Sequence, residues 1–469
     1  MEIDSKHPLS LPLFKRISKV VDSMGVEAYV VGGYVRDYYL RRPSNDIDIV
    51  IVGSGVEVAE ALGKELKTNV SIFRRFGTAM LHIDGHEVEF VGARKESYTP
   101  DSRKPSVEEG SLDDDQRRRD FTINAMAWCI NADRFGELVD PFDGMYDLED
   151  CIISTPCDPD ITFSDDPLRM MRAVRFATQL GFEIEEETFE AIERNAHRIE
   201  IISQERILLE LNKIMLAPRP SMGFELLRHC GLLKLIFPEI EALAGVDKVG
   251  KHAHKDNFKH TMAVLDNVAQ HSSDLYLRWA ALLHDVAKPR TKAYDPKIGW
   301  TFHGHETLGS KMVPKIFRRM TLPLGEPMKF VQKLVFLHLR PIILSEDAVT
   351  DSAVRRLLFE AGEDIEALMT LCRADITSGI ESKVKRYMAN FELVEQKMHD
   401  LEERDRVRNF QPPINGDIIM KTYNVAPCAA IGQIKERIKN AILDGEIPNQ
   451  YDAAYELMER LAAEYGFTK

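Results

Sequence analysis

The period of the hydrophobic positions changes along the chain, and each period predicts a different kind of element. In the N-terminal part, residues 46–52 (DIDIVIV) and 86–91 (HEVEFV) alternate apolar and polar residues, which is typical of half-buried β-strands. Residues 28–31 (AYVV) form a short β-branched run that ends at a pair of glycines, and we expect a further strand there. A short helix is expected at residues 34–42, before a Pro-Ser pair breaks it.

From about Asp165 a helical period replaces the alternation and predicts a helical remainder. The first helical stretch has Pro167 in its first turn and Gly181 at its end, as helix boundaries often do. Between residues 92 and 116 the chain is polar and rich in Pro, Ser, Asp and Glu, which predicts a mobile loop. Residues 238–257 predict a domain boundary. The pattern as a whole predicts an α+β fold, with a small mixed β-sheet head followed by a mostly α-helical remainder.

Composition restricts the partners and the compartment. The chain has 469 residues, enough for three or four domains at roughly 100–200 residues each. Its formal net charge of −14 argues against a general nucleic-acid coat but is compatible with a local basic groove. We see no signal peptide and no apolar run of about 20 residues, so we expect a cytoplasmic protein without a membrane span. None of the cysteines forms a Cys-x-x-Cys pair, and all are expected to be buried thiols: Cys129, Cys151, Cys157, Cys230, Cys372 and Cys428.

Asp46 and Asp48 are the first candidates for chemistry. Alternate side chains of a strand share a face, so the two carboxylates repel each other unless a cation lies between them. Mg²⁺ is usually held by one or two carboxylates together with substrate phosphates, and Glu89 in the next alternating segment could add a third carboxylate. Gly32 and Gly33 expose backbone N–H groups at a helix start, where an anion can bind. The set favours phosphoryl or nucleotidyl transfer, whereas a lone Asp-x-Asp is more often a solvated strand edge.

Several motifs carry a resemblance to a known family. GGYVRD followed by DIDIV, and RRDFTINAMA at residues 118–127, resemble the active-site motifs of polymerase-β-type nucleotidyltransferases. The matching branch contains the class II tRNA nucleotidyltransferases and bacterial poly(A) polymerases, and ERILLELNKIM resembles its later helical motif that braces the neck. The resemblance implies Mg²⁺ ligation by Asp46 and Asp48, with Glu89 as the third catalytic carboxylate. It also implies a set of nucleotide-binding residues: Gly32, Gly33, Arg36, Arg118, Arg119, Asp120, Asn124, Asp166, Arg169 and Arg172.

Within that set, the resemblance assigns different parts of the nucleotide to different residues. Arg118 and Arg119 are expected to face phosphate, whereas Asp120 and Asn124 are expected to contact the incoming ribose. Asp120 is also an acceptable helix N-cap before an apolar run, and both interpretations can hold together.

The stretch DDPLRMMRAVRF carries the expected choice of base. Asp166 and Arg169 are three residues apart, so on a helix they share a face, where the carboxylate accepts hydrogen bonds and the guanidinium donates them. Cytosine and adenine both present an amino donor beside a ring-nitrogen acceptor, which matches this pair. Uracil and guanine reverse both contacts and leave unpaired groups at roughly 1–3 kcal/mol each. The stretch resembles the family's nucleotide-selecting motif with Asp165 in place of its first Glu, and an ordinary helix N-terminus is the alternative.

A second group of candidates lies in the helical part. His284 and Asp285 are adjacent in LLHDVAKPRT, on a segment expected to be helical. Histidine and carboxylate ligands without a thiol suit Mn²⁺, Fe²⁺, Ni²⁺ or Zn²⁺. About residues 250–380 resemble the HD-domain phosphohydrolases, whereas the alternatives are ordinary histidines or a vestigial domain that only shapes an RNA surface. The resemblance implies these metal ligands, the last two as additional candidates: His260, His284, Asp285, Asp375, His305 and His338.

Together the resemblances imply a CCA-adding tRNA nucleotidyltransferase that uses CTP and ATP, binds the tRNA 3′ end and acceptor arm, and has an additional HD phosphohydrolase activity. Poly(A) polymerase, A-only addition and CC-only addition stay open within the same branch. Two alternatives belong to other classes: a metal phosphohydrolase whose first half only binds nucleotide, and a non-catalytic RNA-binding protein. The expected domains are a nucleotidyltransferase head (1–155), a helical neck (156–245), an HD domain (246–380) and a helical, tRNA-binding tail (381–469).

Overall fold

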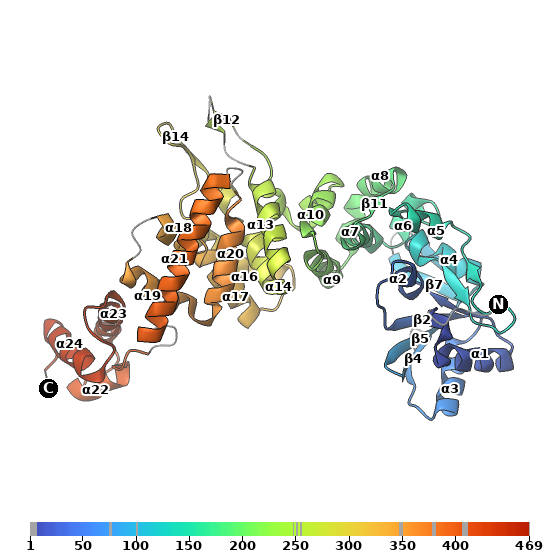
Figure 1. Ribbon diagram of the computed structural model, residues 1–469, viewed down its shortest axis with the longest axis horizontal. Coiled ribbons are helices and arrows are strands. Elements are labelled where there is room, and N and C mark those ends of the chain that lie inside the picture. Colours follow the sequence, from blue (N-terminus) through green and yellow to red (C-terminus); the bar gives the residue numbers. More distant parts are fainter. Residues whose placement is uncertain are drawn as a thin grey trace. The chain divides into compact units, whose positions relative to one another are not determined.

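The computed structural model of the protein describes residues 7–74, 77–99, 102–246, 248–249, 252–253, 256–346, 350–377, 381–405 and 411–468. They belong to two compact units, Met1–Phe237 and Pro238–Lys469, and each unit is described by itself (Figure 1). The first unit contains a β-sheet with helices, and the second is almost entirely helical. The expected α+β fold class is confirmed. The finer division into four domains stays a prediction.

A mixed sheet forms the centre of the first unit. Within the described residues it has 7 strands in the order β3-β4-β5-β2-β1-β8-β9, and β2 runs antiparallel to β1 but parallel to β5. The three strands expected from the alternating and β-branched segments are confirmed as β1 (Ala28–Val31), β2 (Asp46–Ile51) and β5 (His86–Gly92). The remaining strands are β3 (Ser71–Phe73), β4 (Thr78–Ile83), β8 (Ala127–Cys129) and β9 (Leu138–Val139).

The two faces of β2 explain why its sequence alternates. Ile47 and Ile49 are fully or almost fully buried, whereas Asp46 is exposed and Asp48 is half-buried on the opposite face. Helix α3 (Gly55–Leu66) contacts β2, β4 and β5, and α1 (Pro12–Met24) packs against α3. Burial of the apolar face of β2 therefore fixes the direction in which its carboxylates point.

The prediction of a loop at residues 92–116 is wrong. The described residues there form a hairpin of β6 (Arg94–Thr99) and β7 (Ser102–Glu109), followed by α4 (Leu112–Arg117). These two strands pair only with each other among the described strands, and their sequence lacks the apolar alternation that marked β2 and β5. Ser111 caps α4 by a reciprocal capping box with Asp114, a signature that the polar composition concealed.

Short helices complete the first unit after the sheet. Helix α7 packs against α9 and α10, and it ends at Gly181, whose φ of 75° is a left-handed conformation that suits glycine. Its predicted boundaries are confirmed to within a residue or two. Pro167, which we expected in the first turn, is the N-cap residue. The helices are α2 (Gly33–Tyr39), α5 (Gly144–Glu149), α6 (Pro159–Asp165), α7 (Leu168–Leu180), α8 (Glu186–Asn195), α9 (Gln204–Met215), α10 (Pro220–His229) and α11 (Leu232–Ile236).

Packed helices also form the first part of the second unit. Helix α13 contacts α14 and α20, α14 contacts α17, and α17 contacts α16, so these helices surround a common centre. One short hairpin, β14 (Ala293–Asp295) with β15 (Gly299–Thr301), interrupts what we expected to be a helical block. The helices are α12 (Pro238–Glu241), α13 (Asn257–His271), α14 (Leu275–Leu283), α15 (Lys288–Thr291), α16 (His305–Arg319), α17 (Glu326–Leu337), α18 (Leu339–Glu346), α19 (Asp351–Ala361) and α20 (Ile365–Asp375).

A long helix and three shorter ones end the chain. Helix α21 (Glu381–Asp405) contacts α18 and α19. The tail contains α22 (Gly416–Tyr423), α23 (Ala429–Asp444) and α24 (Tyr451–Glu464). Within the described parts of the chain, we find no helix with the length and apolar character that a membrane span requires. The expectation that all cysteines are buried is wrong, because Cys151 and Cys428 are exposed.

Candidate active site and candidate metal centre

The parallel pairing of β2 with β5 brings the three predicted catalytic carboxylates to one face of the sheet. Asp48 is the register partner of Glu89, and Asp46 lies two residues earlier on the same strand. Register partners and alternate residues project from the same face, so Asp46, Asp48 and Glu89 share one side. Burial raises the pKa of Asp48, and the charges of Glu89 and Asp46 raise it further, while Arg119 opposes them.

This charge balance fits a divalent cation with oxygen ligands. A carboxylate that is crowded by two others gains most from a neighbouring positive charge, and Mg²⁺ prefers carboxylate oxygens. The donor atoms of Asp46, Asp48 and Glu89 are not all within 4.8 Å of one another; in the described part of the chain, such groups of three occur only in the second unit. The carboxylates therefore face one region without forming a closed cage, as expected where substrate phosphates supply further ligands.

Gly32 allows the chain to pass close to these carboxylates. Its backbone angles, φ 74° and ψ −139°, are rarely accessible to other residues. A Cβ atom at this position would lie 3.3 Å from Nη1 of Arg119 and 3.5 Å from Oδ2 of Asp48. At Gly33, the first residue of α2, a Cβ would lie 3.6 Å from Nη2 of Arg36. The predicted Gly-Gly turn thus lies beside the carboxylates and beside two of the predicted arginines.

A buried carboxylate that the sequence did not single out holds the arginines of the second motif. Arg119 donates from Nε and Nη2 to Oδ2 of Asp115 at 3.1 and 2.9 Å, and Arg118 donates to the other oxygen of Asp115. Burial alone would raise the pKa of Asp115, but Arg119 and Arg118 outweigh it and keep the pKa low. In the run LDDDQRRRD this acid looks like one of several surface charges. Only its spacing of three and four residues from the arginines indicates the contact.

The other residues of the second motif form a buried hydrogen-bond chain. Arg172 of α7 donates from Nε to Oδ2 of Asp120 at 2.7 Å, and Asn124 donates to Oδ1 of Asp120 at 3.0 Å. Arg36 of α2 donates to Oδ1 of Asn124 at 2.7 Å. Burial would raise the pKa of Asp120, but Arg172 and the hydrogen bonds lower it to about 2. This series of hydrogen bonds brings four predicted nucleotide-binding residues together and joins the head to α7.

The interpretation of Asp120 as a helix N-cap is wrong. The short 3₁₀-helix that follows, Thr122–Asn124, has Phe121 as its N-cap residue, and no side chain caps it. Asp120 instead accepts a hydrogen bond from the backbone N–H of Phe121 at 2.9 Å. Its carboxylate is therefore shared among the main chain, Asn124 and Arg172.

Asp166 and Arg169 are neighbours, but they do not share a helix as we expected. Asp166 is the C-cap residue of α6 in an extended conformation, and Arg169 lies in the first turn of α7. The carboxylate of Asp166 accepts hydrogen bonds from the backbone N–H of Leu168 and from Nη2 of Arg206, both at 3.1 Å. Arg169 donates to the main-chain carbonyl of Arg118, which belongs to the second motif. The predicted base-reading pair is thus positioned from α9 on one side and from the head on the other.

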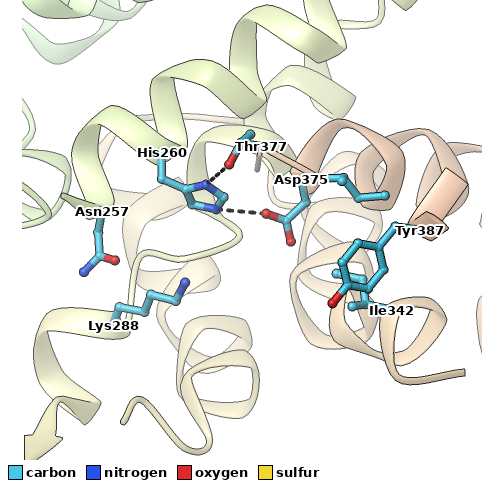
Figure 2. Close-up of a pocket in the computed structure, with 8 residues that line it drawn as sticks. Asn257, His260, Lys288, Ile342, Asp375, Thr377 and Tyr387 are labelled. Atoms are coloured by element: carbon cyan, nitrogen blue, oxygen red, sulfur yellow. Dashed lines mark hydrogen bonds and ion pairs between the residues drawn. The ribbon is translucent and has the colours of Figure 1, made fainter. Parts of the chain in front are cut away.

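Six predicted metal-ligand candidates converge in the second unit. His260 lies within a helix, whereas each of the others lies at a helix end or in a turn. His260 lies in α13, and its Nε2 is 2.8 Å from Oδ1 of Asp375, the last residue of α20 (Figure 2). The expectation that His284 and Asp285 lie on a helix is wrong. His284 is the C-cap residue of α14, and Asp285 lies in the turn that follows. This turn lets the two adjacent side chains face one centre, with Nε2 of His284 3.2 Å from Oδ2 of Asp285.

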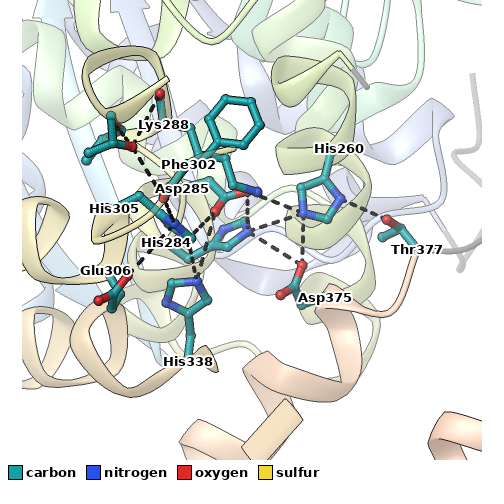
Figure 3. A network of polar contacts seen from close by, with 12 residues as sticks. His260, His284, Asp285, Lys288, Phe302, His305, Glu306, His338, Asp375 and Thr377 are labelled. Atoms are coloured by element: carbon teal, nitrogen blue, oxygen red, sulfur yellow. Dashed lines mark hydrogen bonds and ion pairs between the residues drawn. The ribbon is translucent and has the colours of Figure 1, made fainter. Parts of the chain in front are cut away.

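Asp285 belongs to two groups of ligand atoms. In one group it meets His260 and His284, and in the other it meets His305 and His338; within each group the donor atoms lie within 4.8 Å of one another (Figure 3). Nε2 of His260 is 3.5 Å from Oδ2 of Asp285, whereas Nε2 of His305 is 3.3 Å from Oδ1. The two oxygens of one carboxylate thus face different histidine pairs, which is the arrangement of a bridging ligand.

All four histidines direct the same nitrogen inward. Each Nδ1 is held by a partner outside the cluster, which leaves Nε2 for the centre, as in protein metal sites where an outer hydrogen bond fixes the tautomer. Each pair lies at 2.7 or 2.8 Å: Thr377 Oγ1 for His260, Ala281 O for His284, Phe302 O for His305 and Val335 O for His338.

Electrostatics in this cluster also fit a cation. Burial would lower the pKa of His284, but Asp285 and Asp375 raise it to about 10, so the two carboxylates attract positive charge to that nitrogen. Burial, assisted by His284, lowers the pKa of His338 to about 4, which keeps this histidine neutral as a metal ligand must be. A divalent metal ion would satisfy both carboxylates without protonating the histidines. Nitrogen and oxygen donors without sulfur suit the metals proposed from the sequence.

A cavity of about 300 Å³ opens beside His260 and Asp375. Asn257 and Lys288 lie on one side of it and Ile342 and Tyr387 on the other (Figure 2). The ammonium group of Lys288 contacts Asp285, so a cation already lies at the entrance to the ligand cluster. His303, the exposed neighbour of His305 in FHGHE, does not belong to either ligand group.

Comparisons with known proteins match the parts of the chain that contain the two candidate sites. The Poly A polymerase head domain family matches residues 28–154, the family described as "Probable RNA and SrmB-binding site of polymerase A" matches 181–243, and the HD domain family matches 257–379. An A-adding tRNA nucleotidyltransferase of Deinococcus radiodurans is 33% identical over 353 residues, which is 73% of this chain and 78% of that protein. A multifunctional CCA protein of Pseudomonas fluorescens is 36% identical over 309 residues, which is 63% of this chain and 70% of that protein.

Solved structures show the same fold at lower identity. The CCA-adding enzyme of Bacillus stearothermophilus in complex with CTP has a TM-score of 0.67 and 23% identity, covering 98% of this chain and 99% of that one. The Thermotoga maritima CCA-adding enzyme complexed with tRNA has a TM-score of 0.61 and 22% identity, covering 98% and 97%. The carboxylate face, the histidine cluster and these relatives lead to one conclusion: the chain belongs to the tRNA nucleotidyltransferase family, with a poly(A) polymerase-type head and an HD domain.

Proposed function

We propose that the protein is a CCA-adding tRNA nucleotidyltransferase, which adds C, C and A to the 3′ end of tRNA from CTP and ATP in the cytoplasm. The observation that carries the proposal is the register of Asp48 with Glu89, with Asp46 on the same face and the Gly32 turn beside them. Among the relatives, the proteins from Pseudomonas fluorescens and Neisseria gonorrhoeae are named multifunctional CCA proteins.

The chemistry assigned to this face is attack of the tRNA 3′-hydroxyl on the α-phosphorus of the incoming nucleotide, with pyrophosphate as the leaving group. Mg²⁺ bound by Asp46 and Asp48 would supply the Lewis acid that activates the hydroxyl and neutralises the developing charge. Arg119, fixed by Asp115, lies beside Gly32 and next to Asp48, where it can receive the triphosphate. Arg118 is held by the same carboxylate and extends the positive charge.

Asp166 and Arg169 would choose the base. The carboxylate of Asp166 still has lone pairs beyond those used by Leu168 and Arg206, so it can accept a hydrogen bond from the amino group of C or A. Arg169 has several donors and can serve the ring nitrogen of either base. For UTP or GTP both contacts would be reversed, at a cost of roughly 1–3 kcal/mol for each unpaired group.

A defined tRNA transcript that lacks its terminal CCA tests the proposal. Incubated with labelled CTP alone it should gain two C residues, with both nucleotides it should gain CCA, and with ATP alone it should gain nothing. The 3′ ends are then sequenced. Incorporation of A onto this transcript without any C would overturn the proposal. A transcript ending in CC that alone accepts A would mean an A-adding enzyme, like the named Deinococcus relative, and long A tracts would mean a poly(A) polymerase.

The convergent Nε2 atoms favour a second activity, and we propose that the HD domain is a metal-dependent phosphohydrolase of phosphorylated or 2′,3′-cyclic RNA ends. A transition metal, namely Mn²⁺, Fe²⁺, Ni²⁺ or Zn²⁺, would be held by His260, His284, Asp285 and Asp375. His305 and His338 would hold a further ion through the other oxygen of Asp285. The ion would supply a bound water of lowered pKa as the nucleophile.

Two variants separate the activities. His284→Ala should remove hydrolysis of a 2′,3′-cyclic phosphate and leave CCA addition intact, whereas Asp46→Ala should do the reverse. A wild-type protein loaded with each of the four metals in turn that hydrolyses no phosphoester would overturn the second proposal. It would leave the first one standing.

A further inference from the structure

A larger cavity, of about 830 Å³, lies on the other side of the histidine cluster. Its wall contains three aromatic side chains: Trp300 of β15, Phe302 in the segment after it and Phe336 of α17. Phe336 is 37% exposed and Ile343 of α18 is 54% exposed, so the cavity presents apolar surface to solvent. Ligand pockets for small organic molecules are about 300–1,000 Å³ and combine such surface with a few polar groups.

Two residues connect this cavity to the metal-ligand cluster. His305 lines the cavity, and its Nε2 is 3.3 Å from Oδ1 of Asp285. Lys288 lines both this cavity and the smaller one, and its ammonium group contacts Asp285. The main-chain carbonyl of Phe302 lies 2.8 Å from Nδ1 of His305, so the position of the Phe302 segment is coupled to a ligand. A molecule in the cavity could therefore place a phosphate at Lys288, next to the ligand cluster, while the rest of it remained between the aromatic side chains.

Each of the three aromatic rings has a cation close to it. Nζ of Lys292 lies 4.7 Å from the centre of the Trp300 ring, and Nζ of Lys288 lies 5.7 Å from that of Phe302. The guanidinium of Arg340 lies 5.5 Å from the centre of the Phe336 ring. Single-stranded nucleic acids are bound by this combination, in which aromatic rings stack on bases and cations attract the backbone. By contrast, the smaller cavity has one aromatic side chain, Tyr387, among its lining residues.

We propose that this cavity is the nucleoside-binding subsite of the HD centre. It takes the base and ribose of a nucleotide whose 2′,3′-cyclic or terminal phosphate lies at Lys288, next to the metal-ligand cluster, with the base stacked on Trp300 or Phe336. The inference rests on the second proposed function. In the hydrolysis of the cyclic phosphate, a water oxygen bonds to phosphorus, one ribose P–O bond breaks, and the proton passes to the leaving ribose oxygen. The product is a phosphomonoester that still has its base in the cavity.

A comparison of substrates with and without a base tests the subsite in the full-length protein. The substrates are adenosine 2′,3′-cyclic phosphate and the methyl riboside 2′,3′-cyclic phosphate, which has no base. Trp300→Ala and Phe336→Ala should each raise KM for the adenosine substrate on the order of 10-fold, as expected for the loss of one base stack. They should leave the base-free substrate unchanged, because only the base contacts these rings. Tyr387→Ala, which removes the aromatic ring of the smaller cavity, is the matched control and should not change the ratio of the two KM values.

A tRNA transcript that ends in a 2′,3′-cyclic phosphate tests whether the subsite also serves a polymeric substrate. The transcript and the free nucleotide present the same terminal nucleoside, so both should depend on the same rings. An equal loss with both substrates supports the subsite. The proposal is overturned if wild type hydrolyses both cyclic phosphates equally well, or if Trp300→Ala affects the base-free substrate as much as the adenosine one.

A direct binding measurement separates failure of the subsite from failure of the hydrolase. The chain has 3 tryptophans. Trp128 and Trp279 are buried at 1% and 0% exposure, whereas Trp300 lines the cavity. Adenosine 2′,3′-cyclic phosphate should quench the fluorescence of the wild-type protein but not that of Trp300→Phe. Quenching without hydrolysis would keep the subsite and reject the hydrolase; hydrolysis without quenching would do the opposite.

Discussion

Asp48 and Glu89 face each other across two neighbouring parallel strands, β2 and β5. Neither segment indicates this contact alone, because each is a short alternating run. The pairing adds a third carboxylate to the two that the Asp-x-Asp pattern already places on one face. Burial and the charges of Glu89 and Asp46 raise the pKa of Asp48, so this face attracts a divalent cation.

Asp48→Asn should lower kcat for nucleotide addition by roughly 100-fold or more, because the amide keeps the shape of the side chain but removes the charge that binds the metal. Labelled CTP incorporation into tRNA measures this effect. Glu87→Gln is the matched control, since Glu87 is an exposed carboxylate on the same face of β5 and pairs in register with Asp46. Glu87→Gln should keep the wild-type rate, and retention of most activity in Asp48→Asn would contradict the assigned role.

The metal content of the HD domain should depend on which ligand is removed. Asp285→Asn should abolish transition-metal binding, because both ligand groups share this carboxylate, whereas His338→Ala should remove one ion of two. Elemental analysis of the purified protein after metal loading measures the stoichiometry. His303→Ala, which changes an exposed histidine outside both groups, should bind as much metal as wild type. Equal metal content in Asp285→Asn and wild type would show that Asp285 is not a shared metal ligand.

Arg206→Ala should weaken the preference for CTP over UTP by about 10-fold, because Arg206 holds one oxygen of Asp166 by a hydrogen bond of 3.1 Å. The ratio of kcat/KM for the two nucleotides measures the effect. Addition with CTP should fall much less than the discrimination does. Glu205→Ala alters the exposed neighbour of Arg206 on α9 and should leave the ratio unchanged. An unaltered ratio in Arg206→Ala would mean that Asp166 is positioned without α9.

The Asp120–Arg172 pair predicts a pH dependence of stability. Arg172 and the hydrogen bonds to Asp120 outweigh burial and lower the pKa of Asp120 to about 2 in the folded protein, against about 3.9 when unfolded. Because the folded pKa is depressed, the stabilisation is complete above about pH 4 and is lost as the pH falls toward 2. Asp120→Asn should therefore cost about 2 kcal/mol at pH 7, and the difference from wild type should shrink below about pH 4. Urea unfolding measures it, with the exposed Asp133→Asn as the control; a difference independent of pH would contradict the assignment.

The sequence predicted β1, β2 and β5 but not β4, although β4 also has a buried face. The apolar residues of β2 and β5 pack inward, so their alternation and the polarity of their other face were both visible. The hairpin of β6 and β7 has a polar sequence without the apolar alternation of β2 and β5, which led to the prediction of a loop. Asp115 was missed for a related reason: in an acidic run, nothing local distinguishes the one carboxylate that becomes buried under two arginines.

Helix boundaries explain the remaining errors at the sites. Asp166 precedes Pro167, and a residue before a proline disfavours helical angles, which explains its extended conformation. His284 ends α14 without a glycine or proline at that position, and tertiary packing of the histidine cluster sets this boundary. The candidate ligands could be named from the sequence and stay a prediction, whereas their convergence on Asp285 became visible only in the fold.

Arg169 donates a hydrogen bond to the main-chain carbonyl of Arg118, the residue that precedes Arg119. A nucleotide that pulled Arg169 out of this contact would loosen the backbone beside Arg119 and displace its α-phosphorus from the line of attack. Mismatched nucleotides would then react slowly even at full occupancy, and a higher concentration would not rescue them. Fidelity in this protein would be set at the moment of bond formation rather than at entry.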